Sequence, residues 1–158
     1  MIVKIDQVLI NELVEKAKNS LRRRAIFRFH EKDEDTMHRM LNALEPDTYV
    51  QPHFHPDKHE AFIILQGSIL FVIFDESGRI TQSHILKAGT SDFGLEISPK
   101  TYHTLISLES GTVIFEIKHG PYDAQTDKVF APWSPREGEA NCQEFNEQII
   151  KELGVNLA

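Results

Sequence analysis

Short apolar runs separated by turn residues dominate the middle of the chain and limit the folds open to it. From about residue 25 to residue 120, runs rich in β-branched and aromatic residues alternate with turn signals. Turn signals spaced about 8–12 residues apart are typical of an all-β sandwich or small barrel. The predicted strands cover 25–30, 48–55, 61–65, 68–74, 79–86, 94–97, 102–108 and 112–118. Residues 37–44 fit a strand or a short helix, and Gln66-Gly67 predicts a hairpin turn.

Helical patterns flank this region on both sides. Asp6 is expected to cap a first helix whose apolar residues recur at helical spacing: Leu9, Leu13, Val14, Ala17 and Leu21. A second helix is predicted at 143–153, with Phe145, Ile149, Ile150 and Leu153 on one side. We therefore expect a single domain with a helix in 1–24 packed on a barrel of residues 25–120. Residues 121–158 would form a wrapping loop and the C-terminal helix.

The wrapping loop, residues 121–140, holds several prolines and the only tryptophan, Trp133. It is expected either to cover the mouth of the barrel, with Trp133 on its rim, or to contact the second subunit of a homodimer.

Charge and cysteine content exclude several classes of protein. The 158 residues carry a formal net charge of -7, which disfavours nucleic-acid and anionic-membrane partners. The basic patch Arg22-Arg23-Arg24 is interpreted as a solvated helix end, or else as a contact to an anionic substrate group. The single cysteine, Cys142, allows no internal disulfide and no cysteine-rich zinc site. Because the chain begins without the features of a secretory signal and contains no long apolar span, we expect a cytoplasmic protein.

Three histidines and a glutamate form the chemical centre of the sequence. His53 and His55 are two residues apart, a spacing that points both side chains to the same face of a strand. Glu60 follows at the start of the next strand, and His103 from a later strand completes the set. Three imidazoles and a carboxylate suit one divalent transition metal: iron, manganese or nickel with two open positions, or zinc or copper. The alternative is a solvated histidine-rich turn.

The remaining histidines have no comparable spacing. His59 is expected to point away from the predicted site or to contact it only from outside. We interpret the others as structural, namely His30, His38, His84 and His119.

The spacing of these residues resembles the two motifs of the cupin superfamily. His53, His55, Glu60 and Gly67 match the first motif, in which Asp47 replaces the opening glycine. The second motif is degraded: Pro99 lies four residues before His103, Lys100 stands where a glycine is common, and Ser107 replaces an asparagine. The resemblance implies a double-stranded β-helix, or jelly-roll, barrel with a bound metal, in which His103 matches less closely than the other ligands.

Longer stretches resemble the WbuC family of small bacterial cupin metalloproteins. They are residues 38–44 and 49–53, 115–122 and 127–138. This resemblance covers roughly residues 1–140 and implies an association with gene clusters for O-antigen and other surface polysaccharides. The family has no established reaction, so the resemblance leaves the chemistry open.

The predicted metal site, together with what the WbuC resemblance implies, favours a metal-dependent enzyme, an isomerase or an oxygenase, that acts on a sugar or nucleotide-sugar in O-antigen biosynthesis. The predicted substrate-binding residues are Arg39, Gln51, Lys100 and Tyr102. Glu116 lies inside an apolar strand, where a carboxylate needs a partner, and we expect it to contact a ligand histidine. The alternatives are a non-catalytic, metal-containing sugar sensor that acts through a protein partner, and a metal-free epimerase-like cupin that uses a histidine and a tyrosine as acid and base.

Overall fold

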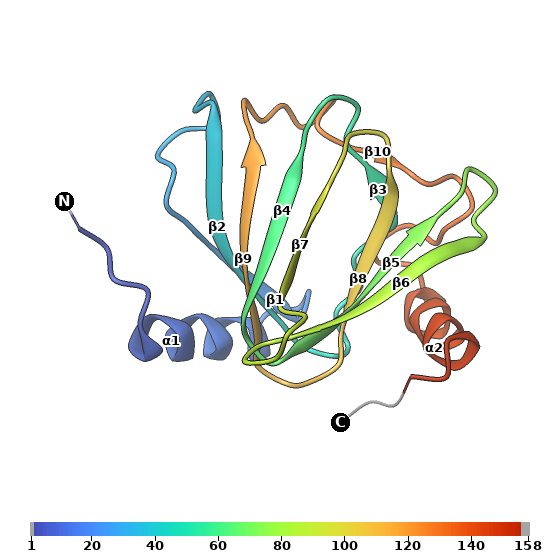
Figure 1. Cartoon of the computed structure of the whole chain (residues 1–158), viewed down its shortest axis with the longest axis horizontal. Helices are drawn as coiled ribbons and strands as arrows, with labels where there is room; N and C mark the ends of the chain where they lie inside the picture. Colours follow the sequence, from blue (N-terminus) through green and yellow to red (C-terminus); the bar gives the residue numbers. More distant parts are fainter. Residues whose placement is uncertain (1, 156–158) are drawn as a thin grey trace.

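Two five-stranded sheets of antiparallel strands form the body of the protein (Figure 1). The computed structural model describes residues 2–155. Its elements are α1 (Gln7–Lys18), β1 (Arg24–Arg28), β2 (Met37–Leu44), β3 (His53–Phe54), β4 (Glu60–Gln66), β5 (Ser68–Phe74), β6 (Ile80–Lys87), β7 (Gly94–Ile97), β8 (Tyr102–Ser107), β9 (Thr112–His119), β10 (Val129–Phe130) and α2 (Cys142–Glu152). One sheet has the order β1-β2-β9-β4-β7 and the other has the order β10-β3-β8-β5-β6. The predicted all-β barrel is confirmed.

The main apolar core lies between the two sheets. Strands from both sheets contribute to it because alternate residues of each strand point inward. Its buried members are Leu44, Phe62, Ile64, Ile69, Phe71, Leu86, Ile97, Leu105 and Ile114. The run Ser68–Phe74 is almost wholly buried, because one face of β5 packs in this core and the other packs under α2.

The predicted hairpin at Gln66-Gly67 is wrong. Strand β4 pairs with β7 and β9, whereas β5 pairs with β6 and β8, so the chain crosses between sheets at Gly67. Gly67 has a φ of +74°, and a Cβ atom there would lie 2.9 Å from the Cα of Thr112. A glycine is needed at this crossing because any side chain would meet the neighbouring backbone.

Three further segments differ from the sequence interpretation or resolve it. Residues 37–44 form a strand, β2, that pairs with β9 along its whole length. Within 48–55, only His53 and Phe54 are in a strand. The wrapping loop contains a short strand that was not predicted, β10, which pairs with β3 and so extends the second sheet.

The two helices pack outside the barrel, as predicted. The Asp6 carboxylate accepts a hydrogen bond from the Leu9 N–H at 3.1 Å and caps α1. One face of α1 is buried against the first sheet, but Leu21 lies beyond the helix end and is exposed, contrary to the prediction. Helix α2 packs on the outer face of the second sheet through Ile149 and its neighbours. Neither helix within residues 2–155 has the length and apolar character to cross a membrane.

Candidate metal centre

His53 and His103 are placed side by side by strand pairing. They are direct partners in the β3–β8 ladder, and their ring centroids are 4.6 Å apart. His55 follows β3 by one residue, and Glu60 begins β4 in the opposite sheet. The two sheets therefore bring all four predicted ligands to the same end of the barrel.

The four side chains converge on one point inside the protein. One potential ligand atom from each residue lies within 4.8 Å of the ligand atoms of the other three. Glu60 Oε1 lies 3.4 Å from His55 Nε2, and Glu60 Oε2 lies 3.3 Å from His103 Nε2. All four residues are buried, with at most 4% of the surface of any one exposed. The alternative of a solvated histidine-rich turn does not fit this burial.

Main-chain carbonyls fix the orientation of each imidazole. His53 Nδ1 donates to the Gln51 carbonyl and His103 Nδ1 donates to the Thr101 carbonyl, both at 2.9 Å. His55 Nδ1 donates to the Asp127 carbonyl at 2.5 Å. Because a carbonyl oxygen only accepts, each Nδ1 carries the proton and each Nε2 keeps a free lone pair. Metal-ligating histidines in proteins are held in this way.

Two atoms at the centre lack a hydrogen-bond partner among the described residues. They are His55 Nε2 and Glu60 Oε2, and both are buried. Buried polar atoms normally have a partner, so two orphaned atoms in one cluster need an explanation. A divalent cation at the point of convergence would bind both. Three nitrogen donors and one carboxylate oxygen fit iron, manganese, nickel, zinc or copper.

Burial and local charge set the protonation of this cluster. Burial lowers the pKa of His53 well below its usual value, and the charge of Lys128 lowers it further. Burial alone would raise the pKa of Glu60. The close imidazoles of His103 and His55 outweigh that effect and hold the pKa of Glu60 well below its usual value. A neutral imidazole and an ionised carboxylate are the forms that bind a metal.

A buried ionic network lies next to His55 and Glu60, and the sequence did not predict it. The Asp127 carboxylate accepts hydrogen bonds from Lys58 Nζ at 2.6 Å and from Lys118 Nζ at 3.1 Å. Lys118 Nζ also lies 3.9 Å from Glu60 Oε1. Burial tends to raise the pKa of Asp127, but the charges and hydrogen bonds of the two lysines hold it below its usual value. Asp127 thus orients His55 through its main chain and anchors both lysines through its side chain.

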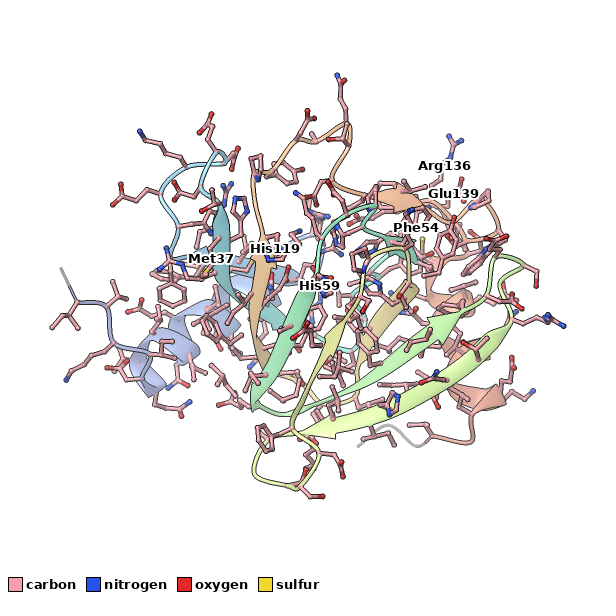
Figure 2. All side chains as sticks on the ribbon, turned by 45° about the horizontal axis from the view of Figure 1, so that its top comes forward. Met37, Phe54, His59, His119, Arg136 and Glu139 are labelled. Atoms are coloured by element: carbon pink, nitrogen blue, oxygen red, sulfur yellow. The ribbon has the colours of Figure 1, made fainter. Side chains whose placement is uncertain are left out.

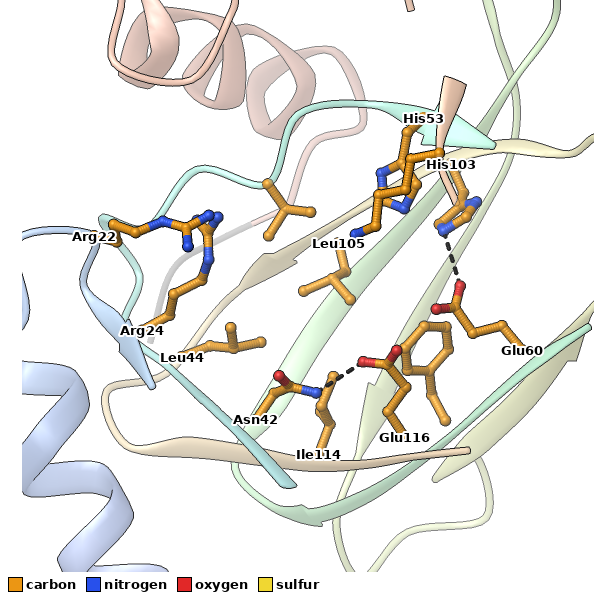
Figure 3. A pocket seen from close by; sticks show the side chains of 13 residues that line it. Arg22, Arg24, Asn42, Leu44, His53, Glu60, His103, Leu105, Ile114 and Glu116 are labelled. Carbon is orange, nitrogen blue, oxygen red and sulfur yellow. Dashed lines mark hydrogen bonds and ion pairs between the residues drawn. The ribbon is translucent and has the colours of Figure 1, made fainter. Parts of the chain in front are cut away.

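Glu116 has a different environment from the one expected. Its Oε2 accepts a hydrogen bond from Asn42 Nδ2 at 2.8 Å (Figure 3). Its Oε1 lies 4.0 Å from Lys118 Nζ. Burial and the neighbouring charge of Glu60 raise the pKa of Glu116 to about 8. Glu116 therefore lies beside the ligand carboxylate, and none of its described contacts is with a ligand histidine.

A cavity of about 180 Å³ opens beside the ligands (Figure 3). One side of it presents the ligand residues His53, Glu60 and His103. Its other walls combine apolar and polar or basic residues: Leu44, Val50, Phe62, Leu105 and Ile114, with Arg22, Arg24, Asn42, Glu116 and Lys128. A second cavity of about 390 Å³ shares Arg22, Asn42, Glu116 and Lys128 with the first, so the two adjoin.

The four predicted substrate-binding residues lie outside the walls of the first cavity. Arg39 Nη2 donates to the Phe29 carbonyl at 3.3 Å, and Gln51 Nε2 donates to Ser134 Oγ at 3.4 Å. Lys100 occupies an exposed turn with a φ of +62°. Tyr102 packs edge-on against Phe54 and Trp133. Their role in substrate binding stays a prediction.

His59 points away from the cluster. Its side chain is 47% exposed and lies 3.2 Å from Glu96. Figure 2 shows His59 and His119 next to each other, and their ring centroids are 5.9 Å apart. His30 and His38 stack on each other elsewhere, with centroids 4.0 Å apart.

The wrapping loop contributes to the site at one end and to the outer core at the other. Asp127, Lys128 and β10 lie beside the metal ligands. Trp133 instead packs against Phe74, Tyr102 and Phe145, between the second sheet and α2. The sequence signal for Asp127 and Lys128 was their place in the stretch 127–138 that resembles the WbuC family, which assigned neither residue to the site.

Comparisons with known proteins give a family and a fold. The model of a domain of unknown function, DUF6016, matches residues 5–86, which is 82 of the 158 residues, so the chain belongs to this family. No curated protein matches the sequence.

Several solved structures share the fold at low sequence identity. CapF bound to the inhibitor 3-isopropenyl-tropolone is 18% identical over 71% of this chain and 32% of its own, with a TM-score of 0.60. A second CapF structure, described as a capsular polysaccharide assembling protein from Staphylococcus aureus, is 16% identical over 67% of this chain and 29% of its own, with a TM-score of 0.56. The chain thus spans about a third of the length of CapF.

Two further proteins, both enzymes by their descriptions, align over more of their own length. L-ribose isomerase from Cellulomonas parahominis is 13% identical over 70% of each chain, with a TM-score of 0.55. Oxalate oxidase in complex with glycolate is 14% identical over 89% of this chain and 70% of its own, with a TM-score of 0.52. CapF, the isomerase and the oxidase are cupin-fold proteins, and the chain has the cupin fold.

Proposed function

We propose that this member of the DUF6016 family is a metal-dependent enzyme that acts on a sugar or nucleotide-sugar in bacterial surface-polysaccharide (O-antigen) biosynthesis. One observation carries the proposal: three imidazoles with fixed Nδ1 protons direct their Nε2 atoms, with Glu60, at one point beside a cavity. A purely structural metal site is closed by protein ligands, whereas four donors leave positions open for a ligand on an octahedral ion.

The substrate class is supported by resemblance and by similar structures. Stretches such as 115–122 and 127–138 resemble the WbuC family, which is associated with surface-polysaccharide gene clusters. One structural neighbour is described as a capsular polysaccharide assembling protein and another as an L-ribose isomerase. The proposal includes a homodimer in the cytoplasm, where sugar nucleotides are made. Light scattering on the purified protein tests the dimer.

The cavity walls define what the chain's own residues do. His53, His55, His103 and Glu60 would hold the ion, which supplies Lewis acidity toward a sugar hydroxyl or carbonyl oxygen. The apolar walls exclude water from one side of the bound ligand. Asn42 and Glu116, joined by a hydrogen bond, present polar atoms to its oxygens.

Elemental analysis of protein purified without chelator or added metal tests the metal. We expect close to one equivalent of a transition metal, and a Glu60→Ala variant purified in parallel should retain far less. Less than about a tenth of an equivalent in the unaltered protein would contradict the proposal, because a preformed site of this type retains its ion through purification.

Reaction type requires a separate experiment. Turnover of nucleotide-sugars by the metal-loaded protein is compared under air and under argon. Turnover that needs air identifies an oxygenase, and equal turnover in both identifies an isomerase. A sugar that raises the melting temperature without any turnover would contradict the enzyme and support a sensor.

A further inference from the structure

Three basic residues line the cavity beside the metal ligands, and none of them is needed to bind a metal. They are Arg22, Arg24 and Lys128, and the carboxylate of Glu60 lines the same cavity. Figure 3 shows the two arginine side chains on the far side of the cavity from Glu60 and His103. Arg22 and Lys128 also line the adjoining cavity, so positive charge continues along the route between the two.

The two arginines share a single carboxylate. Arg22 Nε and Nη2 donate to Glu137 at 2.7 and 2.8 Å, and Arg24 Nη2 donates to both Glu137 oxygens at 2.9 Å. Arg24 is held further by the Tyr49 carbonyl, which accepts from its Nη1 at 2.6 Å. One positive charge of this pair is therefore left without a neutralising carboxylate, and the guanidinium groups are fixed in position.

Lys128 differs from Lys58 and Lys118 in how its charge is paired. Lys58 and Lys118 are both paired with Asp127. Lys128 is half-buried immediately before β10, and no described residue forms a hydrogen bond or ion pair with its ammonium group. A lysine withdrawn from water without a partner is costly, and the cost falls when an anionic ligand pairs with it.

We propose that Lys128, with the Arg22–Arg24 pair, binds the carboxylate or phosphate of the ligand, so that the substrate of this cavity is a small anion. This inference rests on the proposed function for the metal end of the same cavity. With a divalent ion bound, the positive charge of the ion, Arg22, Arg24 and Lys128 exceeds the negative charge that Glu60, Glu116 and Glu137 can carry. A neutral sugar would leave that excess unpaired, whereas a sugar acid or sugar phosphate would neutralise it.

The test uses two simple anions, inorganic phosphate and acetate. Each is titrated into metal-loaded and metal-free protein at constant ionic strength made up with sodium chloride, and affinity is read from the shift in melting temperature. We expect at least one of the two to bind, and Lys128→Gln to weaken that binding about tenfold or more. Binding of phosphate alone indicates a phosphorylated ligand, and binding of acetate alone indicates a sugar acid.

Two variants control for charge and folding. Lys128→Arg keeps the charge and should retain binding within a few-fold. Lys16→Gln removes one charge from an exposed position of α1 and should leave binding unchanged. Chemical unfolding and metal content show whether Lys128→Gln remains folded and loaded.

The outcomes separate this inference from the proposed function. If neither anion binds, or if Lys128→Gln binds them as well as the unaltered protein, the inference is overturned even when the metal is present. If the protein holds no metal but still binds an anion through Lys128, the proposed function fails and the anion site stands.

Discussion

The interior of the barrel contains two regions that are stabilised in different ways. The apolar region between the sheets includes Ile69 and Phe71, and its side chains contact one another without directional bonds. The polar region at the β3–β8 end contains the metal ligands and the Asp127 network, where each atom needs one particular partner. The regions meet where the Phe71 ring stacks on His103, with centroids 5.5 Å apart. Stabilisation is therefore shared among many contacts in the first region and concentrated in a few in the second.

The largest expected effect comes from a nearly isosteric change in the polar region. Asp127→Asn removes the carboxylate that pairs with both Lys58 and Lys118 and leaves two buried ammonium groups without it. Breaking a buried ion pair in this way costs about 3–5 kcal/mol of unfolding free energy. Urea unfolding at pH 7 measures it.

The exposed Asp123 in the same loop provides the control for this prediction. Its carboxylate accepts a hydrogen bond from the Gln125 N–H at 2.8 Å, and an asparagine oxygen can accept the same bond. Asp123→Asn should therefore change the unfolding free energy by less than about 0.5 kcal/mol. Equal losses of unfolding free energy in the two variants would show that the buried Asp127 network contributes no more to stability than an exposed hydrogen bond does.

A second substitution separates the ligand from its neighbour in the sequence. Glu60→Ala removes the one carboxylate of the cluster and should lower metal affinity more than about a hundredfold, because loss of an outer contact alone costs about 10–100-fold. His59→Ala, one residue away but 47% exposed, should leave metal affinity unchanged. Competition with a metal chelator measures both. Similar losses in the two variants would mean that the ligand set is wrongly assigned.

The sequence predicted the strands better than it predicted how they pair. Runs such as 68–74 and 94–97 matched β5 and β7 in full because β-branched residues and flanking turns mark them locally. The hairpin at Gly67 failed because a glycine between two apolar runs has the same local pattern whether the strands pair or cross to different sheets. Pairing depends on contacts with β8 and β9, which lie far along the chain.

The residues of the site also fall into two groups, those that the sequence predicted and those that it did not. His53, His55 and Glu60 were predictable because they lie within one short segment at a recognisable spacing. Lys58 and Asp127 were not, because a lysine or aspartate in a polar loop is usually solvated. Their burial arises only when β10 pairs with β3 and carries the loop across the barrel end.

Metal affinity should decrease as the pH is lowered, because protons compete with the metal for the histidine nitrogen atoms. Protonation of an imidazole removes its Nε2 lone pair, so affinity should decline as pH falls below about 6.5, the free imidazole value. Burial lowers the pKa of His53, so this residue should resist protonation until the pH is lower still. We expect affinity to fall about tenfold or more between pH 7 and pH 5. Titration calorimetry over that range measures it, and a constant affinity would contradict histidine ligation.

The smallest effect is expected in the apolar region and completes the comparison. Ile69 is fully buried, and Ile69→Val removes one methylene from a core in which many other side chains pack together. Such a change costs about 0.5–1.5 kcal/mol of unfolding free energy, well below the loss expected for Asp127→Asn. Because the packing of that methylene is not directional, metal affinity should remain within about twofold of the unaltered protein when measured by chelator competition. If metal affinity instead falls as far as in Glu60→Ala, then the apolar region positions the ligands directly and the division between the two regions does not hold.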